Sequence, residues 1–181
     1  GDAPGPTLPE LLHIVARGEA LDASQAEAAF RSFMAGTASP VHMAALLMGM
    51  EARGVAPGEV AGGVRALRGA MIPVAADDPD TLVDTAGTGG GELTTFNIST
   101  AAALVAAGAG VRIAKHGNRS FSSRSGSADV LEALGVGIEL TPEGMSRVLG
   151  EVGLVFMFAP LLHPAMRHVG PVRRELGTRT V

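Results

Sequence analysis

The sequence predicts an α/β protein in which an N-terminal helical bundle domain precedes an incomplete, mostly parallel sheet domain. Across residues 8–70, apolar side chains recur at helical spacing, with prolines near the starts of segments and glycines near their ends. From residue 82 onward, short apolar runs alternate with small-residue helices, as in parallel sheets with right-handed crossovers. We therefore expect a helical domain over residues 1–76 and the first part of an α/β domain over 77–181.

Four helices are expected in the first domain, and the short loops between them predict a compact antiparallel bundle. Their expected bounds are Pro9 to Gly18, Asp22 to Ala35, Pro40 to Gly54, and a fourth helix that starts at Pro57. The single histidines His13 and His42 are expected to be structural, because metal sites need grouped ligands.

A polar, proline-containing connection at 72–81 leads into the α/β part. The elements expected after it are a strand at 82–86, a helix at 97–109, a strand at 111–115, helices at 127–134 and 142–153, and a buried strand at 154–158. Ligands of such sheets bind beyond the carboxyl ends of the strands. Two polar loops, at 87–95 and 116–126, are expected at that edge.

Composition excludes several classes of function. The net charge of −4 gives no reason to expect nucleic acid or an anionic membrane as a partner. The chain has no cysteine, which excludes disulfides and thiol catalysis. The N-terminus does not resemble a secretory signal, so we expect a cytoplasmic protein.

The first loop follows Asp84 and contains a Gly-rich turn, Gly87–Gly91. Glycines allow backbone N–H groups to converge on an anion, and the helix that starts near Asn97 adds the positive end of its dipole. The spacing fits neither the dinucleotide G-x-G-x-x-G motif nor the P-loop. Taken alone, the turn is equally compatible with an ordinary tight turn.

The second loop, which we call the cationic loop (115–127), contains Lys115, Arg119 and Arg124 together with five serines. The loop contains no acidic residue, and the first one after it is Asp129. A solvated surface, by contrast, usually mixes both signs of charge. Two anion-binding loops at one sheet edge predict a ligand with more than one phosphate group.

A third polar segment covers residues 159–174. His163 and His168 are five positions apart, a poor helical spacing for shared metal ligation. Arg173 and Arg174 are compatible with a guanidinium clamp on a carboxylate and equally with two solvated arginines.

Together these segments resemble the anthranilate phosphoribosyltransferases, of the nucleoside-phosphorylase-like transferase class. The matching stretches are Gly87–Gly90, Thr95–Thr100, Lys115–Ser120, Gly126–Asp129 and His163–His168. The resemblance implies that the amine of anthranilate displaces pyrophosphate from C1 of phosphoribosyl pyrophosphate, with Mg²⁺ present, through an oxocarbenium-like transition state. Such a step needs positioning and neutralisation of the leaving group more than covalent help.

The resemblance also implies which residues contact each substrate, and it implies no separate catalytic residue. The donor contacts are Gly87, Gly90, Gly91, Thr95, Asn97, Ile98, Ser99, Thr100, Lys115, His116, Gly117, Asn118, Arg119, Ser120, Phe121, Ser122, Ser123 and Ser127, with Ser99 also touching Mg²⁺. The anthranilate contacts are Gly87, His116, Asn118, Ala159, Pro160, Met166, Arg173 and Arg174.

Two features depart from the family. Gly91 occupies a position where the family usually has aspartate. The chain is also about half the length of family members, and the Asp-Glu pair that holds most of the Mg²⁺ lies in the other half. We therefore expect a fragment, or one part of a longer protein, that is weakly active or inactive alone.

Two alternatives stay open at this point. A pyrimidine nucleoside phosphorylase shares the helical-plus-α/β plan and a Gly-rich phosphate loop. A non-catalytic phosphate-binding module that dimerises is the other. A homodimer through the helical domain is expected, although the same apolar stripes are compatible with an internal core.

Overall fold

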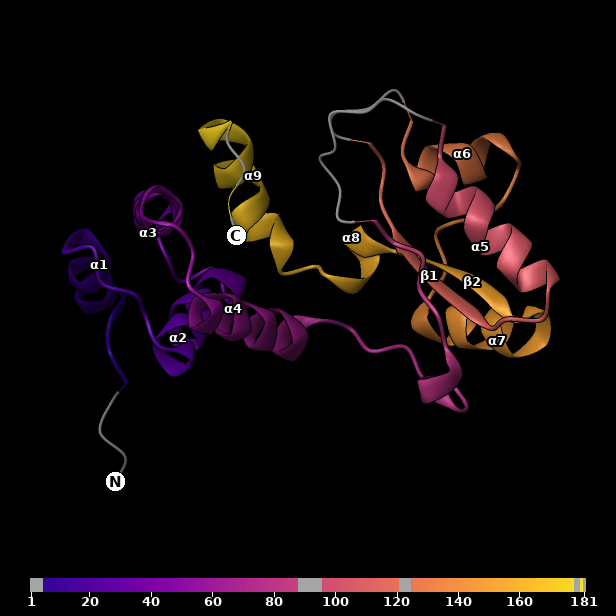
Figure 1. Ribbon diagram of the computed structural model, residues 1–181, viewed down its shortest axis with the longest axis horizontal. Helices are drawn as coiled ribbons and strands as arrows, with labels where there is room; N and C mark the ends of the chain where they lie inside the picture. The colour runs from indigo at the N-terminus through magenta and orange to yellow at the C-terminus, as the bar shows by residue number, and fades with distance from the viewer. Residues whose placement is uncertain (1–4, 88–95, 121–124, 178–179, 181) are drawn as a thin grey trace. The chain divides into compact units, whose positions relative to one another are not determined.

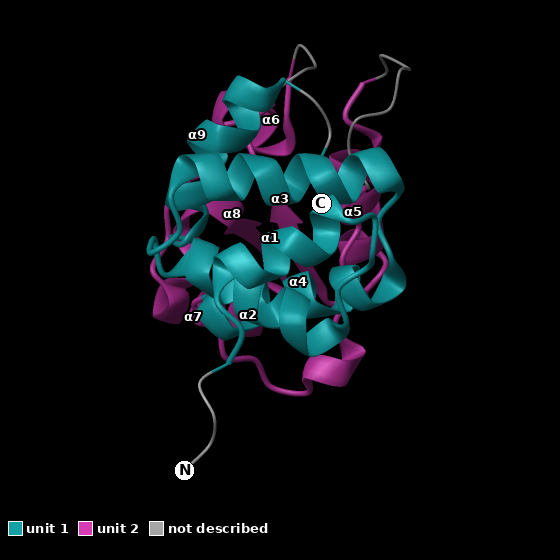
Figure 2. Cartoon of the chain, turned by 90° about the vertical axis from the view of Figure 1, so that its left-hand side faces the viewer, with its two compact units in different colours: residues 1–71, 163–181 teal, residues 72–162 magenta. Residues whose placement is uncertain are grey.

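The computed structural model of the chain describes residues 5–87, 96–120, 125–177 and 180. Residues 1–71 and 163–181 form one compact unit, and residues 72–162 form a second (Figure 2). The first is a helical bundle and the second contains parallel strands with helices, which confirms the predicted fold class. Among the residues that the structure describes, no helix is both long and apolar enough to span a membrane.

The helical unit has five helices within the described residues. They are α1 (Leu8–Ala16), α2 (Ala23–Met34), α3 (Pro40–Arg53), α4 (Pro57–Ala70) and α9 (Met166–Leu176). Local caps fix the starts: the Asp22 carboxylate accepts hydrogen bonds from the amides of Ser24 and Gln25, both at 2.8 Å. The four helices expected before residue 71 are therefore confirmed.

The core of this unit is built from small and medium apolar side chains around Phe33, Leu46 and Met50, which are fully buried. Glu59 of α4 is also fully buried. Its carboxylate accepts hydrogen bonds from Arg53 Nη2 at 2.5 and 2.7 Å, from the Ala56 amide at 2.8 Å and from the Leu21 amide at 3.0 Å. Glu59 therefore joins α3, α4 and the start of α2.

The α/β unit contains the remaining elements. They are the 3₁₀ turn η1 (Pro79–Thr81), α5 (Ile98–Gly108), β1 (Ile113–Gly117), α6 (Ser127–Ala133), α7 (Pro142–Val152), β2 (Leu154–Phe158) and α8 (Ala159–Leu162). Strands β1 and β2 pair in parallel, with Ile113 opposite Leu154 and Gly117 opposite Phe158. Helices α5 and α6 lie on one side of the strands and α7 on the other (Figure 1). Two apolar clusters, one with α6 and one with α7, fill the spaces between.

One element differs from the sequence expectations. The strand expected at 82–86 is reduced to a single parallel bridge between Val83 and Ile113. Residues 163–181, which belong to the predicted 77–181 domain, group by their contacts with the helical unit. The reason is that α9 buries Val169 and Val172 in the bundle core.

Candidate functional site

The carboxyl ends of the strands bring three segments of the second unit together. Because Gly117 pairs with Phe158, the chain leaves both strands at one edge, which places Asn118 beside Ala159 and Pro160. The bridge at Val83 brings the residues up to Gly87 to the same edge. The predicted edge location of the two polar loops is correct for the residues that are described.

The start of α5 forms one wall of this edge. Asn97 is the N-cap, and its Oδ1 accepts hydrogen bonds from the Thr100 amide at 3.2 Å and the Thr100 hydroxyl at 2.7 Å. The Ser99 hydroxyl also donates to Asn97 Oδ1, at 3.3 Å. Ile98 is half-exposed, whereas Thr100 is buried. Asn97 therefore caps the helix and fixes the direction of both hydroxyls.

Lys115 of β1 lies at the centre of the edge and is only 2% exposed. Its Nζ donates to Ser99 Oγ at 3.4 Å and to Thr85 Oγ1 at 3.5 Å, both at the long end of the hydrogen-bond range. Burial lowers the pKa of this ammonium, and the nearby Asp84 carboxylate acts in the opposite direction. A buried cation with two weak partners is suited to exchanging them for an anionic ligand.

The described part of the cationic loop is held by Asp129 of α6. The Asp129 carboxylate accepts from the Gly126 amide at 2.7 Å and from the Ser120 amide at 3.1 Å. These two hydrogen bonds lower the pKa of Asp129, and the positive charge of Arg119 lowers it further. Gly126 approaches the opposite side of the loop closely, because a Cβ there would lie 2.4 Å from the Ser120 nitrogen and 2.7 Å from the Asn118 carbonyl oxygen. The loop therefore has a fixed base.

Arg119 forms its contacts with other side chains of the second unit. Both of its terminal nitrogens donate to the Glu132 carboxylate, and its guanidinium lies 5.5 Å from the centre of the Phe158 ring. The pair is partly exposed, at 45% and 38% of the side chains. Of the loop's cations in the described region, Lys115 rather than Arg119 is thus presented to the edge without a carboxylate hydrogen bond.

The other predicted site residues of the second unit are also near this edge. His116 and Gly117 complete β1, and Ser127 is the first residue of α6. A Cβ on Gly117 would lie 2.6 Å from the Phe156 ring and 3.1 Å from Ser127 Cβ, so a side chain is excluded there. The predictions for Gly90, Gly91, Thr95, Phe121, Ser122 and Ser123 lie outside the described residues.

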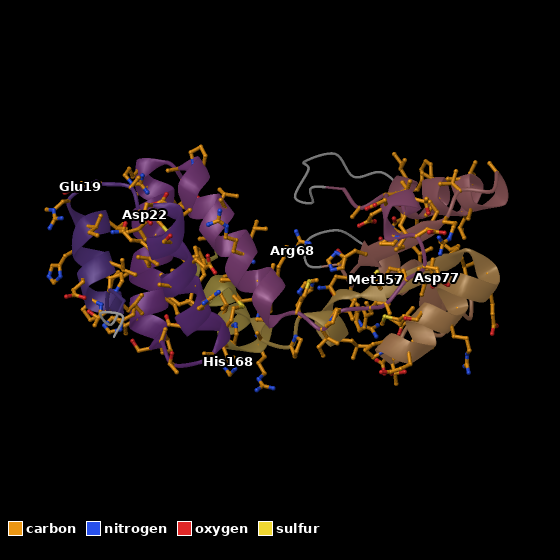
Figure 3. The ribbon with its side chains drawn as sticks, turned by 90° about the horizontal axis from the view of Figure 1, so that it is seen from below. Glu19, Asp22, Arg68, Asp77, Met157 and His168 are labelled. Atoms are coloured by element: carbon orange, nitrogen blue, oxygen red, sulfur yellow. The ribbon has the colours of Figure 1, made fainter. Side chains whose placement is uncertain are left out.

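Three of the predicted anthranilate contacts belong to the helical unit, namely Met166, Arg173 and Arg174 on α9. Arg173 Nη2 donates to the Thr180 carbonyl at 3.3 Å. On the same helix, His168, labelled in Figure 3, packs against Gly36, where a Cβ would lie 2.8 Å from the imidazole ring. The predicted anthranilate contacts are thus divided between the two units.

A cavity of about 230 Å³ lies beside Lys115 and Thr100 in the second unit. The rest of its wall is mostly apolar, with side chains such as Leu104, Leu131 and Val155. Such a lining does not suit a polyphosphate, which needs many hydrogen-bond donors. The chemistry of the two loops therefore points to phosphate binding at the sheet edge and not in this cavity.

The described residues do not form a metal site by themselves. No group of three or more histidine or acidic side chains with suitable geometry occurs among them. Ser99, the predicted Mg²⁺ contact, offers one hydroxyl, and the Lys115 ammonium lies 3.4 Å from it. Mg²⁺ usually binds through carboxylates and substrate phosphates, so Ser99 alone would supply only one of its contacts.

Sequence reasoning missed the contribution of Asp84 and Thr85. The Asp84 carboxylate accepts from the Ala86 amide at 2.9 Å and the His116 amide at 3.2 Å. The Thr85 hydroxyl donates to the Ser99 carbonyl at 2.8 Å. Their position directly between a strand residue and a Gly-rich turn was the available signal.

Comparison with known proteins agrees with this arrangement. Residues 9–71 match the model of the glycosyl transferase family helical bundle domain, and residues 79–181 match that of the glycosyl transferase family a/b domain. The chain is 54% identical over 170 residues to the anthranilate phosphoribosyltransferase of Salinibacter ruber and 53% identical over 171 residues to that of Xanthobacter autotrophicus. Each match covers 94% of this chain and 49% of the relative.

Solved structures show the same relationship. The crystal structure of anthranilate phosphoribosyltransferase from Thermus thermophilus aligns with a TM-score of 0.88 and 49% identity, covering 94% of this chain and 51% of that protein. The Saccharomyces cerevisiae enzyme in complex with PRPP and Mg aligns with a TM-score of 0.88 and 24% identity, over 98% of this chain and 53% of that one, which shows the shared fold. The chain spans about half the length of the relatives it matches. It belongs to the glycosyl transferase family that combines this helical bundle with this a/b domain.

Proposed function

We propose that this chain is the donor-binding half of an anthranilate phosphoribosyltransferase, a pentosyltransferase of tryptophan biosynthesis. The observation that carries the proposal is the buried Lys115 ammonium between the Ser99 and Thr85 hydroxyls, where the cationic loop meets the start of α5. The identity of over 50% to two enzymes of that name supports the choice of reaction.

In this proposal, the residues of the chain bind and orient the donor. Lys115 neutralises a phosphate group of phosphoribosyl pyrophosphate, and the positive end of the α5 dipole attracts a second one. Because the leaving pyrophosphate gains negative charge, these positive groups are worth more in the transition state than in the bound substrate. The chemistry needs no covalent intermediate with the protein.

The acceptor, the metal and the assembly are further parts of the proposal. Arg173 would pair with the anthranilate carboxylate through its guanidinium fork. Mg²⁺ would bind together with the donor and neutralise its pyrophosphate group, with Ser99 as one contact. The protein would act in the cytoplasm as a homodimer formed through the helical unit, on which α3 and α4 expose Val41, Val60 and Val64.

Two single substitutions in the complete protein test the assignment of the substrates. Lys115→Ala should raise the Michaelis constant for phosphoribosyl pyrophosphate by about 10- to 100-fold, because a charge-assisted hydrogen bond is lost. Arg173→Ala should raise the constant for anthranilate by a similar factor. Arg147→Ala removes an exposed cation of α7 and is the control, with both constants unchanged.

The loss of anthranilate fluorescence with donor and Mg²⁺ measures turnover. No turnover by the wild-type protein at any Mg²⁺ concentration would refute the proposal. Phosphorolysis of thymidine or uridine would instead identify a nucleoside phosphorylase. Donor binding without turnover would identify a binding module. If both substitutions changed the same Michaelis constant, the assignment of the two substrates would be wrong.

A further inference from the structure

The carboxylate of Asp84 replaces a backbone acceptor at the end of the parallel ladder. Val83 makes both ladder bonds, since its amide donates to the Arg112 carbonyl and its carbonyl accepts from the Ala114 amide, each at 3.0 Å. A regular parallel ladder would continue with the His116 amide donating to the carbonyl of Thr85. That amide donates to Asp84 Oδ1 instead, at 3.2 Å. The side chain thus ends the strand and satisfies the amide that the departing backbone leaves behind.

The same oxygen also shapes the segment that follows. Asp84 Oδ1 accepts the Ala86 amide at 2.9 Å, which is the local turn that aspartate forms two residues ahead. One carboxylate oxygen therefore joins the approach to the Gly-rich turn with the end of β1. Thr85 connects a third piece, because its hydroxyl donates to the Ser99 carbonyl in the first turn of α5.

We propose that Asp84 is a positioning residue that holds the backbone leading to Gly87 and the end of β1 at a fixed separation for the donor. The assignment rests on the proposed function for its ligand. Asp84 does not contact the donor in this proposal. It acts through the backbone of residues 86 and 116.

Two substitutions test these hydrogen bonds in the complete protein. Asp84→Ala removes the acceptor, whereas Asp84→Asn keeps an oxygen that accepts both amides. Asp80→Asn removes an exposed acid of η1 and is the matched control. Calorimetry with phosphoribosyl pyrophosphate at neutral pH measures affinity, and hydrogen exchange of the His116 amide measures the bond.

Asp84→Ala should weaken donor binding about tenfold at neutral pH and speed exchange of the His116 amide. Asp84→Asn should restore both to nearly the wild-type values, and Asp80→Asn should match the wild type. Unchanged affinity and exchange in Asp84→Ala would overturn the inference, as would an Asp84→Asn variant that binds the donor as weakly as Asp84→Ala. A wild-type protein that binds no donor refutes the proposed function instead, and this outcome is separate because the exchange measurement needs no ligand.

Discussion

Replacing Gly126 by alanine is expected to displace the base of the cationic loop. The added Cβ would lie 2.4 Å from the Ser120 nitrogen, 2.6 Å from the Arg119 carbonyl carbon and 2.7 Å from the Asn118 oxygen. All three atoms belong to the backbone, so no side-chain rotation relieves the contact. Gly126 has φ −86° and ψ 176°, which any residue adopts, so the expected effect is purely steric.

The size of the displacement follows from these distances. An ordinary contact begins at 3.4 Å, so the loop must move by about 1 Å relative to α6. Such overpacking costs about 1–3 kcal/mol of stability. The movement also stretches the bond of 3.1 Å between the Ser120 amide and Asp129. Because an error of 1 Å in positioning costs on the order of 100-fold, donor affinity should fall by about 10- to 100-fold.

Calorimetry with phosphoribosyl pyrophosphate and thermal unfolding of the complete protein measure the two effects. Gly150→Ala is the matched control, because a Cβ at this exposed position in α7 meets no atom within 4 Å. Alanine there should raise stability by about 0.5–1 kcal/mol and leave binding unchanged. Donor affinity within twofold of the wild type in Gly126→Ala would refute the view that this loop base positions the phosphates.

Two further predictions concern buried charges. The pKa of Glu59 is lower than its ordinary value of 4.5: burial raises it, but hydrogen bonds led by those from Arg53 lower it more. Its stabilisation is therefore complete above that value and is lost as the pH falls through the lowered pKa. Glu59→Gln should cost about 3 kcal/mol at pH 7 in urea unfolding and flatten the acid dependence, and an unchanged acid dependence would contradict this. Lys115→Met should raise stability at pH 7 while abolishing tight donor binding. This gain relative to the wild type should vanish above pH 10.5, where the lysine is neutral in both states.

The features that the sequence predicted correctly depend on neighbouring residues. Asp22 and Ser39 cap helices through amides two or three positions away, so the pattern in the chain is enough to place the helix starts. The edge location of the cationic loop follows from the parallel connection, which puts the ends of successive strands side by side.

The features that it did not predict depend on partners far along the chain. Asp84 reaches the His116 amide across 32 positions, and only the register of Val83 against Ile113 makes that bond possible. The pairing of Arg119 was not predicted, because its partner Glu132 lies 13 positions later in the chain, on α6. A sequence pattern gives the type of charge in a loop but not which charges neutralise one another.

The pairing of charges at the sheet edge explains why Lys115 stands apart. The Asp129 carboxylate is satisfied by loop amides, and Arg119 by Glu132, so these charges contribute to the shape of the loop. Lys115 is buried with two long hydrogen bonds and a lowered pKa, an arrangement that costs stability in the free protein. A structural role would favour an apolar residue of similar length at that position. The cost is offset only when an anion reaches the ammonium, and for this reason the buried lysine is a stronger indication of phosphate binding than the partly exposed Arg119 of the same loop.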